Sequence, residues 1–232
     1  MLDDMRKLEI QTWFAAFTLA SALICSCSHE EKVDGASFQP RLIKDYYEVQ
    51  KVTVAQSEAN RATVKFDGNT ITSTYRADEY ERLSGYYHDQ NYNVTRVPGW
   101  DNSALADSVM TVDVTTLSDF DKTHPANSSM ADAVTLRWAS ASEYILNGYK
   151  AKKGSTTTEG GFMDSSYETL TSYTSLLKDV DGRKGGMRLL FPFCYLTFNT
   201  TPETKGSHDF LLKIKMAGQS SEITGRFTMT FK

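Results

Sequence analysis

The sequence predicts a mainly β protein, because strand signals recur along it at short intervals. Residues 108–115 and 208–216 alternate apolar and polar side chains, the pattern of a strand with one buried face. Glycine, asparagine, aspartate and serine separate such runs, and these residues favour turns. Seven or eight short strands with few helical signals are typical of two packed sheets. We therefore expect an antiparallel immunoglobulin-like β-sandwich with one or two short helical insertions.

Each expected strand follows from its own composition. Residues 45–54 are rich in tyrosine and valine, which favour strands. Residues 62–66 alternate, and Asp67-Gly68-Asn69 predicts a turn into a returning strand over residues 70–75. The turn residues 217–221 predict a closing hairpin. The remaining expected strands cover residues 108–115, 133–138, 186–198, 208–216 and 222–231.

Two segments predict helices. Residues 142–148 begin with serine and end with glycine, the residues that favour helix starts and stops. Residues 166–178 space their tyrosines and leucines close to the helical period. Since no clear linker interrupts the chain, we expect one domain over residues 41–232. Two small sandwiches split near residues 125–132 are the alternative.

The first 26 residues have the organisation of a secretory signal peptide. Residues 13–24 are uncharged and mostly apolar. This run is shorter than the roughly 20 residues that span a membrane, and it has the length of a signal-peptide core. Because Asp3 and Asp4 weaken the positive end, Met5 is a better expected initiator than Met1.

Two cysteines end this segment, in the order Ile24-Cys25-Ser26-Cys27. The order resembles a bacterial lipobox, and the resemblance implies lipidation of Cys27 as the first residue of the mature chain. Several acyl chains on one residue anchor a protein stably to a membrane. Residues 27–40 lack periodicity, so we expect a flexible tether after the lipid.

Two acids, Glu30 and Glu31, follow closely after Cys27. An acidic stretch at this place resembles the export signal of surface lipoproteins of the Bacteroidota. The resemblance implies an outer-membrane lipoprotein facing the cell surface, with the periplasmic face as the alternative.

The charge of the chain argues against nucleic-acid binding. The chain holds 25 basic and 29 acidic residues, and residues 1–26 contain two and three of them, which leaves 23 and 26. Such a chain, without a basic patch, lacks the cationic surface that binds phosphate backbones. Cys194 is the one cysteine left unmodified, and its apolar surroundings predict a buried, inert thiol.

No motif nominates a catalytic residue, a metal or a cofactor. His88, His124 and His208 lie far apart in sequence, without zinc-ligand spacing. Asp119 and Asp121 flank a phenylalanine, and we interpret them as solvated turn residues rather than calcium ligands. Neither a Gly-x-Ser-x-Gly elbow nor a glycine-rich phosphate loop is present. We therefore expect a protein that is not an enzyme, with a hydrolase as the least favoured alternative.

The most unusual segment is residues 75–100, because five of the twelve tyrosines lie within its first 18 residues. Tyrosine and tryptophan offer large rigid contact areas at low entropic cost. Packing of these rings onto the sandwich is the favoured interpretation of the segment, and a ligand-binding surface is the alternative. If the segment binds a ligand, the expected ligand contacts are Tyr80, Tyr86, Tyr87, Tyr92 and Trp100.

Two further stretches, TLSDFDKTHPANSS and DFLLKIKMAGQSSEITGRFTMTFK, complete a resemblance to small surface lipoproteins of gut Bacteroidota with an immunoglobulin-like domain. The resemblance implies a binding or accessory role for glycan or protein ligands. The alternative is a fimbria-like adhesive subunit whose terminal strands pair with a neighbour. Asp107-Ser108-Val109 also resembles an O-glycosylation motif of exported Bacteroidota proteins, which implies a sugar on Ser108.

Overall fold

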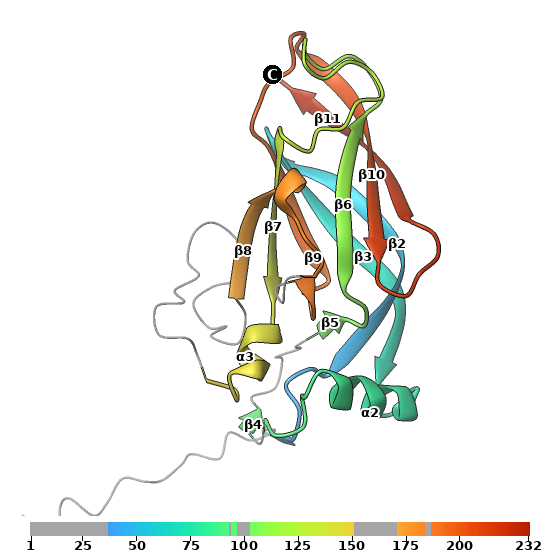
Figure 1. Ribbon diagram of the computed structural model, residues 1–232, viewed down its shortest axis with the longest axis vertical. Helices are drawn as coiled ribbons and strands as arrows, with labels where there is room; N and C mark the ends of the chain where they lie inside the picture. The colour runs from blue at the N-terminus through green and yellow to red at the C-terminus, as the bar shows by residue number, and fades with distance from the viewer. Residues whose placement is uncertain (1–36, 93, 97–102, 151–170, 184–186) are drawn as a thin grey trace, which may run out of the picture. The chain divides into compact units, whose positions relative to one another are not determined.

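Residues Phe38–Lys232 form one compact unit in the computed structural model of the chain (Figure 1). The alternative split near residues 125–132 lies within this unit. Cys27 and most of the expected tether lie outside the described residues. The end of the expected tether, Ser37–Gln39, forms strand β1, which pairs with β4 (Val94–Arg96). The structure describes residues 37–92, 94–96, 103–150, 171–183 and 187–232.

The larger sheet has six strands in the order β5-β2-β3-β9-β7-β8. Neighbouring strands pair antiparallel, except for the parallel pair of β2 and β5. Its strands are β2 (Asp45–Glu58), β3 (Arg61–Thr72), β5 (Ser103–Leu105), β7 (Val134–Ser140), β8 (Thr171–Leu176) and β9 (Phe193–Phe198).

The smaller sheet has three antiparallel strands in the order β11-β10-β6. These are β6 (Val109–Thr116), β10 (Gly206–Met216) and β11 (Ile223–Phe231). The hairpin of β10 and β11 keeps one register along its length, from Gly206 opposite Phe231 to Ile214 opposite Ile223. The prediction of two mainly antiparallel sheets and of this closing hairpin is confirmed.

The expected turn at Asp67-Gly68-Asn69 is wrong, because β3 continues through it. Gly68 lies opposite Val49, at a bulge in β2. A Cβ atom on Gly68 would lie 1.9 Å from the carbonyl oxygen of Glu48. The glycine therefore serves the close approach of two strands, a known use of glycine inside sheets. The turn of this hairpin is formed instead by Ala59 and Asn60, between β2 and β3.

The expected helix over residues 166–178 is also wrong in its described part. Thr171–Leu176 is strand β8, followed by one short 3₁₀ turn, Leu177–Asp179. β8 pairs with β7 along its whole length, and the ring of Tyr173 stacks on Trp138 at a centroid distance of 5.3 Å. Pairing with an open sheet edge thus outweighs a local helical spacing. The other expected helix is confirmed as α3 (Ser142–Leu146).

One apolar core contains side chains of both sheets. Phe210 and Leu212 of β10 are fully buried, as are Val64 of β3 and Leu196 of β9. Fully burying one such side chain stabilises a fold by roughly 1.5–3 kcal/mol. The alternation of apolar and polar residues along each strand therefore explains which side chains form the core.

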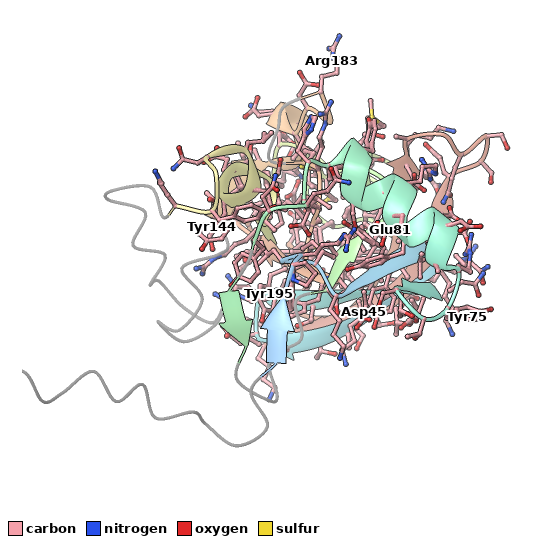
Figure 2. All side chains as sticks on the ribbon, turned by 90° about the horizontal axis from the view of Figure 1, so that it is seen from below. Asp45, Tyr75, Glu81, Tyr144, Arg183 and Tyr195 are labelled. Atoms are coloured by element: carbon pink, nitrogen blue, oxygen red, sulfur yellow. The ribbon has the colours of Figure 1, made fainter. Side chains whose placement is uncertain are left out.

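A second cluster of buried residues is rich in tyrosine and includes residues of α2 (Ala77–Tyr86), a helix that the sequence analysis did not predict. Figure 2 looks at this end of the molecule, with Glu81 on α2 and Tyr75 beside its first turn. The ring of Tyr46 stands at the centre of the cluster, 5.6 Å from Tyr80 and 6.2 Å from Tyr87.

Candidate functional site

Two of the expected ligand contacts, Tyr80 and Tyr87, are core residues. Their hydroxyls donate hydrogen bonds to the carbonyl oxygens of Ile43 (2.6 Å) and Ala106 (2.7 Å). Burial raises the pKa of both phenols to about 12. These two rings pack onto the sandwich, as the favoured interpretation predicts, and the ligand contacts proposed at them are wrong, since neither face of a buried ring is open to a ligand.

The other expected contacts do not form one exposed row either. Tyr86 is 60% exposed, and its ring meets Tyr87 edge-on at 4.9 Å. Tyr92 is half-buried beside Tyr149, at a ring distance of 5.3 Å. Trp100 lies outside the described residues. The physical reason is helix α2, whose period turns the two buried tyrosines inward and leaves Tyr86 outside.

Asp89 holds the tyrosine-rich cluster to the start of the domain. Its fully buried carboxylate accepts the backbone N–H groups of Leu42 (2.9 Å) and Ile43 (2.8 Å). The Tyr149 hydroxyl donates a third hydrogen bond of 3.0 Å. Burial raises the pKa of this carboxyl, although the three hydrogen bonds act in the opposite direction. These partners give Asp89 a structural role.

A row of aromatic rings runs from just before β9 along the outward face of this strand, and we call it the β9 aromatic row: Phe191, Phe193 and Tyr195. Neighbouring ring centroids are 4.9 Å and 5.8 Å apart. Cys194 and Leu196, each next to Tyr195 in the strand, are buried in the core, so the strand alternation turns Phe193 and Tyr195 to the opposite face. All three rings remain partly exposed.

Polar and cationic side chains flank this row on both neighbouring strands. On β3, Lys65 lies opposite Phe193, and Thr63 lies opposite Tyr195. On β7, Arg137 lies opposite Tyr195. Directly opposite residues of paired strands share one face of a sheet. We call this surface, the row with its flanking residues of β3 and β7, the β9 face.

Arg61 completes the β9 face at the start of β3. Its guanidinium carbon lies 5.9 Å from the centroid of the Tyr195 ring, within the range of a cation–π contact. It also pairs with Glu58, with 2.7 Å between Nη1 and Oε1. Both side chains of that pair reach solvent, so the pair itself adds little stability. The face therefore combines flat apolar rings with hydrogen-bond donors.

The sequence analysis missed the β9 aromatic row because residues 186–198 are apolar on both faces. Alternation is hidden when the outward residues are phenylalanine and tyrosine and the inward ones are cysteine and leucine. The prediction for the inward side holds, since Cys194 is buried and burial raises the pKa of its thiol to about 12. The one available signal was three aromatic residues at strand spacing, residues 191, 193 and 195.

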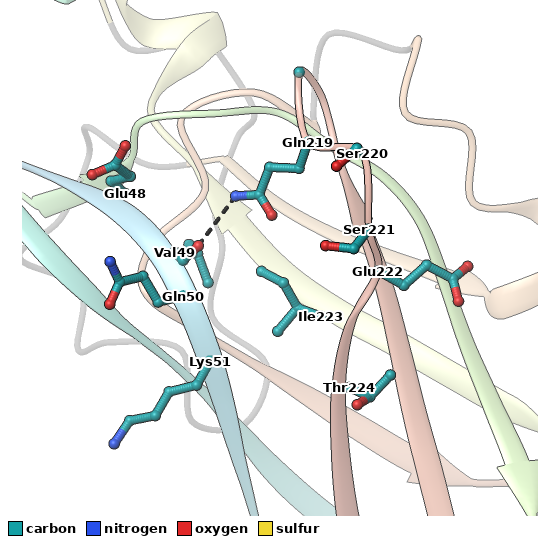
Figure 3. Close-up of a pocket in the computed structure, with 11 residues that line it drawn as sticks. Glu48, Val49, Gln50, Lys51, Gln219, Ser220, Ser221, Glu222, Ile223 and Thr224 are labelled. Atoms are coloured by element: carbon teal, nitrogen blue, oxygen red, sulfur yellow. Dashed lines mark hydrogen bonds between the residues drawn. The ribbon is translucent and has the colours of Figure 1, made fainter.

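A polar groove of about 700 Å³ lies between the edge of β2 and the turn that joins β10 to β11 (Figure 3). The side-chain amide of Gln219 crosses it and donates a 3.1 Å hydrogen bond to the carbonyl oxygen of Val49. The Glu48 carboxylate accepts a 2.7 Å hydrogen bond from Arg76, which lowers the pKa of Glu48. With this acid already paired, the groove offers no acid–base pair among its lining residues.

A buried histidine joins two carboxylates in the loop before β7. Nδ1 of His124 lies 2.9 Å from Asp121 and Nε2 lies 3.0 Å from Asp132, so both ring nitrogens act as donors. Burial alone lowers the pKa of His124, but the two aspartates outweigh it and raise the pKa. Despite some burial, hydrogen bonds from Thr123 and His124 lower the pKa of Asp121 to about 2.

Asp121 is therefore an ion-pair partner, and the interpretation of it as a solvated turn residue is wrong. Between it and Asp119, Phe120 is buried in the main core. The charged triad with His124 holds the loop around this ring. The three side chains of the triad satisfy one another's hydrogen bonds, which indicates a structural role.

Ser108, the expected glycosylation site, is half-buried directly before β6. Its carbonyl oxygen accepts a 2.8 Å hydrogen bond from the backbone of Ala217. Among the described residues, no group of three His, Cys, Asp or Glu side chains is placed to hold a metal ion. A search of the same residues found no helix with the length and hydrophobicity to cross a membrane.

Comparisons of the chain with family models, with curated proteins and with solved structures gave no match.

Proposed function

We propose that this chain is a non-enzymatic lipoprotein, anchored in the outer membrane through lipid on Cys27, whose domain binds glycan or protein ligands at the cell surface. The lipobox-like residues 24–27 support the anchor, and Glu30 and Glu31 support the surface-facing side. The β9 aromatic row carries the binding role. The proposed binding surface is therefore in the middle of the larger sheet and not in the tyrosine-rich segment.

The finer fold belongs to the same proposal. We infer an immunoglobulin-like sandwich from a core that contains side chains of both the six-stranded and the three-stranded sheet. The parallel pairing of β5 with β2 departs from a purely antiparallel version of this architecture.

Phe191, Phe193 and Tyr195 lie next to one another on an outward sheet face and remain partly exposed. Among the residues that the structure describes, none of the three belongs to a buried cluster. Single apolar residues on a surface need no explanation, whereas a contiguous apolar patch rimmed by polar groups marks an interaction site. Phe191, Phe193 and Tyr195, rimmed by Lys65 and Arg137, meet that description.

Ligand binding is tested with the full-length chain in detergent against a panel of neutral and charged oligosaccharides and peptides. We expect Tyr195→Ala to weaken binding of the ligand found about tenfold or more, the loss of roughly 1.4 kcal/mol or more. Tyr86→Ala removes a more exposed tyrosine ring, on α2, and serves as the control. Equal binding by both variants, or no binding to any probe, would overturn the role of the β9 aromatic row.

The anchor is tested separately, because it rests on the sequence alone. Cys27→Ser is expected to move the protein from the membrane fraction to the soluble fraction, and mass spectrometry of the wild-type chain is expected to find acyl groups on Cys27. An unacylated wild-type chain in the soluble fraction would contradict the proposed localisation.

A fimbria-like subunit is the second candidate, and the edge of β11 favours it. β11 is the last strand of its sheet, and exposed strand edges are sites where another chain can pair. Gln56 of β2 occupies this edge at Thr230, where its side chain both accepts from N–H (2.9 Å) and donates to C=O (3.0 Å). If β11 accepts a neighbouring strand, Gln56→Ala should promote self-association in sedimentation experiments, whereas an unchanged monomer would refute this candidate.

A further inference from the structure

The polar groove of Figure 3 lies where the edges of two strands separate. β5 pairs with β2 only over Asp45–Tyr47, and the groove begins at the next residue of β2, Glu48. On its other side is β11, the last strand of the smaller sheet. Among the described residues, no strand pairs with β2 beyond Tyr47 on this side, or with the outer edge of β11. Two strand edges therefore face each other without a ladder of backbone hydrogen bonds.

These two edges meet at one end of the seam and separate at the other. A Cβ atom on Gly225 of β11 would lie 3.0 Å from Cγ2 of Val52 and 3.3 Å from its carbonyl oxygen. Near the β10–β11 turn, in contrast, the side chain of Gln219 crosses the gap to reach Val49. Directly paired backbones lie about 4.8 Å apart, which leaves no room for a side chain between them. The edges are therefore farther apart at the groove than in a paired sheet.

Side-chain amides bind the backbone of both edges. Gln219 donates a 3.1 Å hydrogen bond to the carbonyl oxygen of Val49 on β2. At the closed end, the amide of Gln56 accepts from the N–H of Thr230 on β11 and donates to its carbonyl oxygen. A residue of a neighbouring strand makes this same pair of hydrogen bonds. Both edges therefore bind the chemical group that forms a peptide backbone.

The groove also presents backbone groups of β11. Along an antiparallel pair, the backbone groups of successive residues point alternately toward the partner strand and away from it. Those of Thr230 point away from β10, and Thr224 has the same place in the alternation, so its N–H and C=O face the groove. The charged ends of Lys51 and Glu222 turn away from the gap (Figure 3). A ligand of this groove is therefore recognised by hydrogen bonds more than by charge.

The position of the groove between two strands restricts its occupant. A strand inserted there uses both of its own edges, one for β2 and one for β11. A strand that belongs to a sheet of a folded partner has at least one edge already paired, so it does not fit. The lining residues 48–51 and 222–224 cover three to four strand positions, about 10–13 Å. The occupant is therefore a short extended segment that lies outside any sheet.

A second copy of the described part of this chain does not offer such a segment. Its longest fully described loop, residues 117–133, is held by the ion triad of His124, and Phe120 of this loop is buried in the core. We therefore assign the segment to another protein.

We propose that the groove between β2 and β11 binds an extended peptide segment of another protein, which displaces the side chain of Gln219 and pairs through its backbone with Val49 and Thr224. The site is separate from the β9 face and goes beyond the binding proposed there. It also differs from the fimbria-like candidate, in which β11 pairs with a strand of a neighbouring copy.

The test selects peptides from a displayed library of random heptapeptides, with the full-length chain in detergent as the target. A selected peptide is synthesised with a fluorescent label, and anisotropy measures its Kd. Two analogues carry N-methyl groups on one or the other alternate set of residues, so that one analogue cannot donate to β2 and the other cannot donate to β11. We expect each analogue to bind about tenfold or more weakly, with little effect of salt on the parent peptide.

Two variants of the chain test the same contacts from the other side. Gln219→Ala removes the side chain that the peptide displaces, so we expect binding about two- to tenfold tighter, while Gln90→Ala, an exposed glutamine outside the groove, should leave Kd unchanged. Thr224→Pro removes an N–H that β10 does not use, and we expect it to weaken binding about tenfold or more. Thr228→Pro makes the same change on the same edge outside the groove and is the matched control.

Thermal unfolding shows whether each proline variant is intact, and the N-methyl analogues test the pairing on the wild-type chain. Enrichment of no peptide, full binding of either analogue, or binding that survives Thr224→Pro in a folded variant would overturn the inference. A peptide that is lost in Tyr195→Ala and retained in Thr224→Pro would overturn it and support the proposed function. Self-association without added peptide, abolished by Thr224→Pro, would overturn the assignment of the segment to another protein.

Discussion

Replacing Asp89 by alanine tests the claim that one buried carboxylate holds the tyrosine-rich cluster to the start of the domain. The variant leaves the N–H groups of Leu42 and Ile43 without their acceptor. A buried donor that loses its partner costs about 1–3 kcal/mol. The lost bond from Tyr149 adds roughly 0.5–1.5 kcal/mol. The cost of burying the wild-type charge, visible in the raised pKa of Asp89, offsets part of this loss.

We therefore expect Asp89→Ala to lower the free energy of unfolding by about 2–4 kcal/mol, a large share of the roughly 5–15 kcal/mol of a typical domain. Urea unfolding followed by tryptophan fluorescence measures this loss. Hydrogen exchange should become faster at the amides of Leu42 and Ile43. Asp78→Ala, in the first turn of α2, is the control, and its loss should stay below about 1 kcal/mol because only the helix dipole is affected.

Asp89→Asn separates geometry from charge. Its amide retains one acceptor oxygen but presents an NH₂ group to the second backbone N–H, so we expect a loss close to that of alanine. A stability within about 0.5 kcal/mol of the wild type for Asp89→Ala, with unchanged exchange at both amides, would refute the structural role.

Three more changes test other parts of the structure. Gly68→Ala should lower the free energy of unfolding in urea by about 1–3 kcal/mol, because the new Cβ meets the backbone of β2. Gly85→Ala, in a helix with room for a methyl group, should raise it by about 0.5–1 kcal/mol. Equal effects of the two substitutions would contradict the β2–β3 geometry. Because the pKa of His124 is raised in the folded state, its charge contributes fully to the free energy of unfolding below the ordinary pKa of about 6.5, and this contribution is lost as pH rises through the folded pKa. His124→Gln should flatten this loss of stability with pH in a series of unfolding measurements. A pH profile identical to that of the wild type would refute the ion triad. Gln56→Ala should speed hydrogen exchange at the end of β11, while Gln50→Ala, also exposed on β2, should not; similar rates in both variants would show that Gln56 does not cover this edge.

Much of the fold could be predicted because alternation along one strand is a local property. The β10–β11 hairpin follows from residues 208–231 alone, since its apolar residues all fall on one face and a polar turn separates them. The short helix α3 likewise begins and ends at residues that favour those positions.

The errors share one physical cause, which is that partners distant in sequence decided the outcome. Residues 171–176 became a strand because the edge of β7 pairs with them. No helix was predicted within residues 75–100, although Tyr80, Leu83 and Tyr87 have the spacing of an amphipathic helix face that needs a core beneath it. That core is formed by residues as distant as Tyr46 and Ile145.

The strand-rich character of the domain, its closing hairpin and the buried state of Cys194 could be predicted, because each depends on residues close together along the chain. Which aromatic residues became core and which became surface depended on tertiary packing. Tyr80 and Tyr87 turned inward because a second cluster of apolar residues lay beneath α2, and Phe193 and Tyr195 turned outward because Cys194 and Leu196 already filled the inner face of β9. An aromatic ring has the same composition in either place, and its role depends on what packs against it.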